Sequence, residues 1–418
     1  MTPSISTERN MLSDNELLYT MALTRLQAFT PANQRTLLDE VGSATAVYEN
    51  RRDLGRMMQH FSPRAADILA DMDAQLPRCE EELRYAKDHH IHIVAIQNDA
   101  YPRRLRQCAD APVVLYQLGP ADLNARHVIS VVGTRRCTER GRDLCQRLAA
   151  DLARLRPDVL VISGLAYGID IAAHRAALDN NLKTAAVLAH GLDTIYPPLH
   201  RNTAIEMLQQ GALLTEYMHA AHIDKVNFVQ RNRIVAGLAD AVVVVESAAK
   251  GGSLITAEMA MGYSREVMAF PGRTTDPASA GCNQLIRKNA AHLITCAQDL
   301  IDDLGWEPLQ QADGQGTLDL ERPTPLPLPG REGSSMNLSG SCPLNSQMVT
   351  APLPPREGQG GGSAIVAALH SSGGECSLSD LIAKTAMPVA QLTSMLLTME
   401  MQGIIKKLAG NKYHLINA

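Results

Sequence analysis

The spacing of hydrophobic and polar positions divides the chain into stretches of different character. Residues 11–75 carry apolar side chains at helical spacing, as in the segments ELLYTMALTRLQ, ANQRTLLDEV and SPRAADILADM. Pro31 and Pro63 stand where helices can begin, because the first turn of a helix does not use the N–H group that proline lacks. Residues 77–90 have the pattern of one more, highly charged helix. We therefore predict a helical domain over residues 1–76.

From residue 91 onward, short apolar runs replace the helical spacing. Most of these runs are followed by a loop that contains glycine and then by a helix-like stretch. Nearly continuous Val, Ile and Leu runs that alternate with helices indicate a parallel sheet covered on both faces. The fold class that we expect is α/β, an extended Rossmann-like, doubly wound and mostly parallel sheet within residues 77–306. The predicted strands are Ile91–Ile96, Val128–Val132, Val159–Ile162, Ala185–Leu188, Ala241–Val245 and Val267–Phe270.

The last third of the chain contains two further segments. Eight prolines fall between Pro323 and Pro355, and a glycine run follows them, so residues 307–362 are expected to be a Pro/Gly-rich linker. A PxxP ligand for a partner domain is the alternative. Residues 363–418 have the pattern of three short helices and a hairpin, which predicts a winged-helix domain. The third of these helices, residues 388–401, has no Lys or Arg, which favours docking to a protein over direct contact with DNA.

The distribution of charge along the chain leads to a different expectation from the net charge alone. The net charge is -5, which by itself disfavours a nucleic-acid partner. However, residues 126–300 hold 19 basic and 16 acidic side chains and are the only one of the four segments with a positive balance. The eight cysteines form no CxxC pair, so no metal site is expected. Scattered thiols and a polar N-terminal segment lead us to expect a cytoplasmic protein.

The candidate chemistry lies in four loops that follow predicted strands, where ligands of doubly wound sheets bind. The first loop contains Gly133, Thr134, Arg135 and Arg136. A glycine permits close approach of the backbone, and an arginine offers several donors to a phosphate. Arg135 occupies the place of the second glycine of the dinucleotide motif GxGxxG, so a nicotinamide cofactor is not expected.

The second loop joins a strand to a helix through Ser163, Gly164 and Gly168. We expect Asp170 to cap the following helix. Ser163, Asp170 and His174 could also form a hydrolytic triad, but the GxSxG turn that would expose the serine is absent.

The third loop contains Arg231, Asn232 and Arg233, which we place at the start of a helix, where the helix dipole favours anions. The alternative is that these arginines pair with acids of the chain, such as Asp170, Glu216 or Glu246.

The fourth loop contains Lys250, Gly252, Ser253 and Thr256. Successive glycines can form a nest of N–H groups for an anion. The Walker A motif GxxxxGK[ST] does not occur in the chain. An enzyme of the phosphoribohydrolase type is the alternative function, but its motif PGGxGTxxE fails here because Thr256 and Glu258 are too close in sequence. We therefore expect no catalytic residues and no cofactor.

The order of these motifs resembles the DprA/Smf family of DNA-processing proteins over about residues 91–300. The motifs are GTRR, SGLAYGIDIAAH, LAHGLDTIYP, LLTEY, FVQRNRIVAGLADAVVVVES, GGSLITAEMA, FPG and GCNQLIRKNAAHLI. The resemblance implies a Rossmann-like domain that binds single-stranded DNA, forms homodimers, and delivers the recombinase RecA to incoming strands during natural transformation. It brings no established catalytic activity. It also implies that the N-terminal domain is similar to a helix-hairpin-helix or SAM-like module.

Carried over motif by motif, the resemblance implies that the four loops supply the DNA contacts. The family's usual SGSL segment reads Gly251-Gly252-Ser253-Leu254 here, so that one hydroxyl is missing. The hairpin of the N-terminal module is expected to be rich in glycine but reads Phe29-Thr30-Pro31-Ala32-Asn33, and we therefore expect that domain to be a scaffold. The expected DNA-binding residues are Gly133, Thr134, Arg135, Arg136, Ser163, Gly164, Gly168, Arg231, Asn232, Arg233, Lys250, Gly252, Ser253 and Thr256.

Overall fold

A computed structural model describes most of the chain. It divides into two compact units, Met1–Leu309 and Gln310–Ala418, each of which is considered by itself. The expected linker lies almost entirely outside the described residues, and most of the expected third helix at 388–401 does too. The described residues are 12–26, 29–54, 63–307, 361–372, 374–385, 387, 392, 396, 399–400, 404–408 and 412–415.

The chain begins with helices whose first turns are capped by hydroxyl side chains. The side chains of Ser13, Thr30 and Ser43 each accept a hydrogen bond from a backbone N–H of the first helical turn that follows. Pro31 and Pro63 are the first helical residues of α2 and α5, as predicted. The helices are α1 (Asp14–Thr24), α2 (Pro31–Val41), α3 (Ala44–Glu49), α5 (Pro63–Ala70) and α6 (Met72–Asp88).

Helix α6 runs across the domain boundary that we expected between residues 76 and 77. It contains Pro77 in its interior, where proline costs one backbone hydrogen bond. Buried residues on both sides of the proline, Met72 before it and Cys79 and Ala86 after it, hold the helix together by packing. The helical segment and the sheet that follows lie in one compact unit, and the exact boundary between two domains within it stays a prediction.

A nine-stranded, mostly parallel sheet forms the centre of this unit, with the order β1-β2-β6-β5-β4-β3-β7-β8-β9. All six predicted strands are confirmed. The β1–β2 and β2–β6 pairs are antiparallel, and the other neighbours are parallel. The sequence analysis did not identify β2, β6 and β9. The strands are β1 (His92–Ala95), β2 (Val114–Leu118), β3 (His127–Val132), β4 (Val159–Ser163), β5 (Lys183–Val187), β6 (Ala212–Thr215), β7 (Ala241–Val244), β8 (Glu266–Ala269) and β9 (His292–Leu293).

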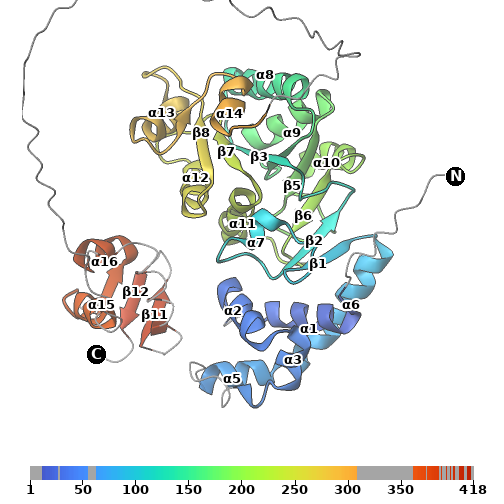
Figure 1. Cartoon of the computed structure of the whole chain (residues 1–418), viewed down its shortest axis with the longest axis vertical. Coiled ribbons are helices and arrows are strands. Elements are labelled where there is room, and N and C mark those ends of the chain that lie inside the picture. The colour runs from blue at the N-terminus through green and yellow to red at the C-terminus, as the bar shows by residue number, and fades with distance from the viewer. Residues whose placement is uncertain are drawn as a thin grey trace, which may run out of the picture. The chain divides into compact units, whose positions relative to one another are not determined.

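Side chains along the central strands alternate between two cores. In β3, Val128 and Val132 belong to one core, whereas Ile129 and Val131 belong to the other. Helices α7, α11, α12 and α13 pack on the first face, and α8, α9 and α14 pack on the second (Figure 1). The fold is therefore the doubly wound α/β arrangement that the sequence predicts. These helices are α7 (Arg103–Arg106), α8 (Glu139–Leu155), α9 (Ile169–Asp179), α11 (Lys225–Leu238), α12 (Gly252–Gly262), α13 (Ala280–Arg287) and α14 (Ala297–Asp303), with the smaller η1 (Pro198–His200), α10 (Arg201–Met207) and η2 (Pro277–Ser279) in loops between strands.

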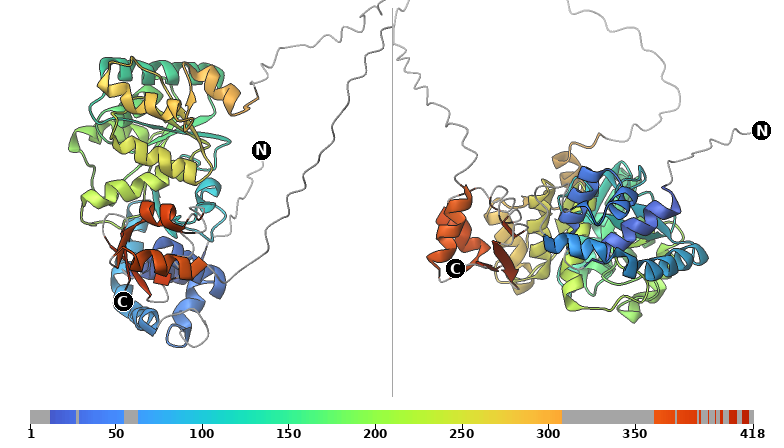
Figure 2. Two further views of the ribbon diagram at one scale, coloured as in Figure 1. Left: turned by 90° about the vertical axis from the view of Figure 1, so that its left-hand side faces the viewer. Right: turned by 90° about the horizontal axis from the view of Figure 1, so that it is seen from below.

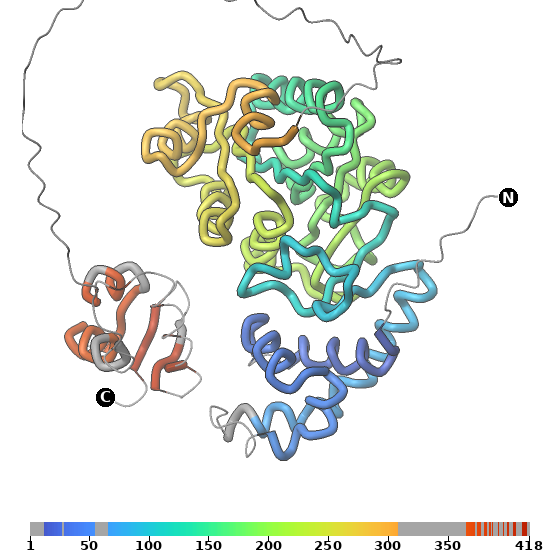
Figure 3. The backbone as a smooth tube through the Cα atoms, viewed as in Figure 1, coloured from blue at the N-terminus to red at the C-terminus, as the bar shows by residue number. Residues whose placement is uncertain are grey.

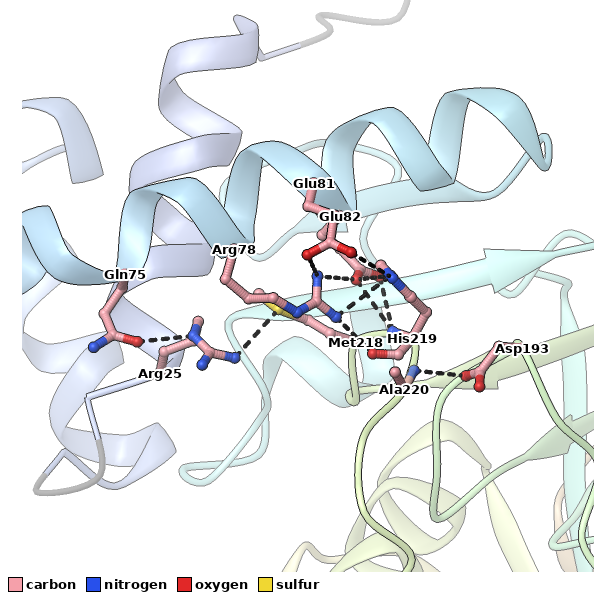
Figure 4. A network of polar contacts seen from close by, with 9 residues as sticks. All are labelled: Arg25, Gln75, Arg78, Glu81, Glu82, Asp193, Met218, His219 and Ala220. Carbon is pink, nitrogen blue, oxygen red and sulfur yellow. Dashed lines mark hydrogen bonds and ion pairs between the residues drawn. The ribbon is translucent and has the colours of Figure 1, made fainter.

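The N-terminal helices pack against the β1–β2 edge of the sheet and share its first core (Figure 2). The chain passes from α6 directly into β1, as the backbone trace shows (Figure 3). Glu82 of α6 accepts hydrogen bonds from the backbone N–H of His219 at 3.1 Å (Figure 4). Arg78 donates to the carbonyl of His219 at 2.6 Å and pairs with Glu82 at 3.0 Å. Helix α6 therefore holds the loop between β6 and α11.

The second unit contains two described helices and a three-stranded antiparallel sheet of order β10-β12-β11. The two strands of the predicted hairpin are present, with Ile405 opposite Leu415. Within the described part of the chain, no helix combines the length and the apolar character that a membrane span requires. The elements are α15 (Gly361–His370), β10 (Glu375–Ser377), α16 (Leu378–Thr385), β11 (Ile405–Leu408) and β12 (Lys412–Leu415).

Glu246 connects the end of β7 to the start of α8, and its substitution tests how much this connection contributes to stability. Its fully buried carboxylate accepts a hydrogen bond from the N–H of Thr138 at 2.9 Å and another from the Thr138 hydroxyl, at the start of α8. We expect Glu246→Ala to lower the free energy of unfolding by about 2 kcal/mol, because buried donors lose their acceptor. Urea unfolding measures this change.

The matched control is Glu139→Ala, which also removes one negative charge near the start of α8, from a side chain of the helix itself. The Glu139 side chain is 79% exposed, so its removal should change stability by no more than about 0.5 kcal/mol. Equal effects of the two substitutions would contradict the capping role of Glu246.

Candidate functional site

The order of the strands places the candidate site at one edge of the sheet. From β3 the chain winds outward through β4, β5 and β6, and it then returns to place β7 on the other side of β3. Such a reversal opens a crevice beyond the carboxyl ends of the two strands, where ligands of this fold class bind. A cleft of about 630 Å³ lies there, lined by the loops after β3, β4, β5 and β7 and by one face of α11.

The cleft brings together most of the residues that the sequence indicated, from all four loops. Four expected residues are not in its lining: Ser163, Gly168, Arg233 and Lys250. The ten that line it are Gly133, Thr134, Arg135, Arg136, Gly164, Arg231, Asn232, Gly252, Ser253 and Thr256.

The first loop supplies the exposed positive charge of the cleft. The backbone N–H of Thr134 donates to the carbonyl of Glu246 at 2.8 Å, which fixes the loop to the end of β7. Arg135 and Arg136 are both exposed. The Arg135 guanidinium lies 5.6 Å from the centroid of the Phe228 ring, within the range of a cation–π interaction. Two solvated cations thus stand at the opening of the cleft.

In the second loop, two of the three residues that we expected to contact DNA have structural roles instead. Ser163 is fully buried and donates to the carbonyl of Val131 at 2.6 Å. Gly168 has φ of +81°, and a Cβ there would lie 2.1 Å from the carbonyl oxygen of Thr134. Only glycine permits this close approach of the first and second loops. Ser163 and Gly168 therefore shape the cleft and do not face it.

The expectation that Asp170 caps α9 is wrong. The helix begins at Ile169 with Gly168 as its N-cap residue, and Asp170 is already within the first turn. The Asp170 carboxylate faces the cleft and accepts from the N–H of Ala166 at 3.4 Å. The hydrolytic triad has no basis either, since Ser163 is bonded to a carbonyl and His174 to the Thr184 hydroxyl at 2.7 Å.

The three residues of the third loop lie within α11 and not at its start, which corrects the sequence analysis. The helix begins at Lys225 and is capped by Asp224, whose side chain accepts from the N–H of Val226. Residues 225, 228, 229, 232 and 235 recur at helical spacing and line the cleft. Had Asp224 been identified as the cap, this spacing would also have placed Lys225 at the site. The sequence analysis missed Lys225.

Arg231 is a buried arginine at the base of the cleft, only 3% exposed. Its Nη1 donates to the carbonyl of Gly164, just after β4, at 2.6 Å and also to the carbonyl of Val187 at the end of β5. A Cβ on residue 164 would lie 2.4 Å from this nitrogen, so Gly164 makes room for the guanidinium. Arg231 thus links two strand ends and places fixed positive charge beneath the cleft.

Arg233 faces away from the cleft. It is 8% exposed and forms an ion pair with Glu216. Burial raises the pKa of the Glu216 carboxyl, and the Arg233 charge counteracts this shift. The sequence left open the alternative that these arginines pair with acids of the chain, and Arg233 does so. Its geometry gives no support to a DNA contact.

Burial controls the charge of the other titratable groups near the cleft. It raises the pKa of Asp170, against the opposing effects of Arg231 and Arg135. Burial lowers the pKa of His190 and His200, and it lowers that of His174 to about 3. These three histidines are therefore neutral near pH 7, and the positive charge of the site comes from its arginines and Lys225.

The fourth loop opens α12 at the cleft. Gly251 is the N-cap residue and offers no side-chain acceptor to the first N–H groups of the helix, an arrangement that suits an anion. The Ser253 hydroxyl donates to Ser247 at 2.9 Å, so it is partly engaged within the protein. Lys250 is exposed just outside the lining. Among the residues that the structure describes, no group of three His, Cys, Asp or Glu side chains is arranged to hold a metal ion.

Comparison with known proteins identifies the family. Residues 92–305, about half of the chain, match the family described as DNA recombination-mediator protein A. The chain belongs to the DNA recombination-mediator protein A family. This confirms the resemblance to DprA/Smf proteins that the motifs indicate. Residues 349–411 match the DprA winged helix domain, which confirms the fold expected for the C-terminal part.

Individual relatives of this family align over large parts of the chain. A protein of Mycobacterium tuberculosis is 42% identical over 243 residues, which make up 56% of this chain and 62% of that protein. The DNA processing protein DprA of Streptococcus pneumoniae is 40% identical over 207 residues, 50% of this chain and 72% of that protein. The chain thus spans less than two thirds of the length of the first relative.

One solved structure of the family shares the fold, and a second aligns with part of the chain. The X-ray structure of DNA processing protein A from S. pneumoniae is 31% identical, covers 70% of this chain and 98% of its own, and aligns with a TM-score of 0.58. A structure of DNA processing protein A from Helicobacter pylori, described with its single-stranded DNA binding mode, is 29% identical, covers 51% of this chain and 95% of its own, and aligns with a TM-score of 0.46.

The depressed pKa of His174 predicts a specific pH dependence of stability. Between pH 6.5 and about 3 the unfolded chain binds a proton that the folded chain does not, so this group makes the protein less stable as the pH falls. His174→Asn retains a polar group for Thr184 but cannot take up the proton. Its destabilisation relative to the wild type, measured by urea unfolding, should therefore shrink by about 2 kcal/mol between pH 7 and pH 5. A difference that stays constant with pH would contradict the buried, neutral state of His174.

Proposed function

We propose that this chain binds single-stranded DNA in the cleft at the carboxyl edge of the sheet, mainly through phosphate groups. The observation that carries the proposal is the convergence of loops from four strands on one cleft that is lined by Arg135, Arg136, Arg231 and Lys225. Membership in a family of DNA-processing proteins supports DNA as the anion.

The lining favours binding over catalysis. Among the described residues of the lining, Asp170 is the sole carboxylate, and none is His or Cys. A hydrolytic mechanism needs a nucleophile or a positioned water together with a base near neutral pKa, and burial leaves the nearby histidines with lowered pKa values. We therefore propose a non-enzymatic binder, with no cofactor.

The hydrogen-bond donors of the cleft indicate which part of a DNA strand it recognises. Guanidinium groups and backbone N–H groups at a helix start recognise phosphate and carry no information on base sequence. We therefore propose binding that tolerates any sequence and that weakens steeply with salt, because each neutralised phosphate releases counterions.

The proposal extends to recombination. A recombination mediator acts by giving a recombinase access to single strands, and we infer that this chain binds as a homodimer and loads RecA on the DNA that it holds. Family membership supports this part. The C-terminal domain, whose expected third helix lacks basic residues, would then contact a protein.

Arg135 tests the DNA site most directly, because its side chain is exposed and can be removed without disturbing the core. Arg135→Ala should weaken binding of an oligothymidine by about tenfold at moderate salt. It should also reduce the slope of log affinity against log salt by about 0.7 for each phosphate that the side chain neutralises. Gel-shift titrations at several salt concentrations give both values.

The matched control for this test is Arg154→Ala. Arg154 lies in the last turn of α8, 70% exposed, at the end of the helix remote from the cleft. The control should retain the affinity and salt slope of the wild type. Unchanged binding in a folded Arg135→Ala protein would refute the assignment of the cleft.

Loading of RecA makes a separate prediction. On single strands covered by a single-strand binding protein, the chain should shorten the lag before RecA hydrolyses ATP, and Arg135→Ala should lose most of this effect while Arg154→Ala retains it. The lag is measured by phosphate release. If the wild-type chain binds single strands but leaves the lag unchanged, RecA loading is wrong and the DNA site stands.

A further inference from the structure

Two exposed tyrosines lie in loops that border the cleft. Tyr167 follows β4 and is 46% exposed, and Tyr196 follows β5 and is 45% exposed. Tyr196 also belongs to the lining. In contrast, the hydroxyl of Tyr263, at the end of α12, donates to Asp110 at 2.6 Å, and its ring packs against the first core. Tyr167 and Tyr196 are therefore exposed near the site, whereas Tyr263 has a structural role.

A buried histidine contacts each of these residues, through the ring of Tyr167 and through the backbone of Tyr196. The backbone N–H of Tyr196 donates to His190 Nε2 at 3.2 Å, and the Tyr196 ring meets the Phe228 ring edge to face at 5.7 Å. The Tyr167 ring meets the His200 ring edge to face at 5.1 Å, and His200 Nδ1 bonds to the carbonyl of Leu165 at 2.8 Å. His190 and His200 are each no more than 2% exposed. Rings that are fixed in this way lose little conformational freedom when a ligand packs on them.

We propose that Tyr167 and Tyr196 form a platform on which unpaired bases of the bound strand stack as it leaves the phosphate cleft. This inference rests on the proposed function and assigns the base-binding part of the same site. Within the described residues, neither phenol oxygen makes a hydrogen bond in the structure, which leaves each ring to act through its apolar face. Stacking on an aromatic face is available to every base, so it adds affinity without selecting a sequence.

Charge beside the platform fits a strand that continues past it. Arg175 of α9 and Arg201 at the start of α10 are exposed. Arg175 donates to the Thr203 hydroxyl at 3.3 Å and lies close enough to His200 to lower its pKa. These two cations lie on the elements beside His200, the ring partner of Tyr167, and offer partners to the phosphates that follow the stacked bases.

The platform would give the site a preference for single strands. Phosphates are present in both single and double strands, so the cleft by itself discriminates weakly between them. In a duplex each base face is covered by its neighbours, and packing on a tyrosine would require unstacking. An unpaired strand presents base faces without this cost. The platform thus adds affinity to single strands alone.

The test compares Tyr167→Ala and Tyr196→Ala with the wild type, using full-length protein and an oligothymidine. Each substitution should weaken single-strand binding by about tenfold at fixed salt and leave the slope of log affinity against log salt unchanged, because every phosphate keeps its cation. Binding to duplex DNA should stay the same. Tyr167→Phe and Tyr196→Phe should bind like the wild type, since stacking does not use the hydroxyl.

An oligonucleotide with abasic sugars identifies the partner of the rings. This probe keeps the phosphates and lacks the bases, so it should bind the wild type and the two alanine variants equally. Leu199→Ala is the control substitution, because Leu199 is 74% exposed and near the platform but has no aromatic face. It should change affinity by less than about twofold.

The outcomes separate the platform from the proposed function. If Arg135→Ala flattens the salt slope while the tyrosine variants bind as the wild type does, the cleft stands and the platform is wrong. If the tyrosine variants change the salt slope or weaken binding of the abasic probe, the rings act by shaping the cleft, and the stacking role is refuted. If Arg135→Ala also binds normally, the proposed site itself fails.

Discussion

The geometry of the site depends on one buried guanidinium. Arg231 donates to the carbonyls of Gly164 and Val187, which belong to the ends of neighbouring strands, from a helix that packs on the sheet. Carbonyl groups at the ends of parallel strands have no further strand partner, and a buried acceptor without a donor is costly. Arg231 satisfies two of these groups at once, and it thereby fixes the distance between α11 and the edge of the sheet.

Several other features follow from the position of this charge. Residue 164 must be glycine, because a Cβ would occupy the place of the guanidinium. Asp170 can face a cleft built for anions because Arg231 lies close to its carboxylate and opposes the effect of burial on its pKa. The same positive charge adds to the burial that lowers the pKa of His174. One side chain therefore shapes the cleft and, second to burial, influences the charge of the groups around it.

The sequence predicted the sheet well because buried strands have a simple pattern. Runs such as Val128–Val132 are apolar on both faces, so they do not depend on any distant contact for their identification. The short strands β6 and β9 were missed because their pairing with neighbours, and not their composition, defines them. The first, second and fourth loops of the site were located correctly, since each follows an identified strand, whereas the residues of the third lie within α11.

Orientation within the site could not be predicted from spacing in the loops alone. Arg231 and Arg233 are two residues apart, which places them on different sides of a helix and gives them different partners, two carbonyls for one and Glu216 for the other. The sequence showed two equivalent arginines because the start of α11 was placed too late in the chain. A single N-cap residue, Asp224, sets the phase of the helix.

The rotational position of α11 about its axis also helps to explain how a chain with an acidic net charge can contain a site for anions. Of the positive charge that the sequence counts in residues 126–300, part is neutralised by acids of the same chain, as in the buried pair of Arg233 with Glu216 and the exposed pair of Arg142 with Glu139. What remains at the cleft is a small group of cations held at strand ends and at one helix face. An anionic polymer responds to this local field within about 10 Å at moderate salt. The distribution of a few arginines, fixed by helix phase and strand order, therefore matters more for binding than the total charge.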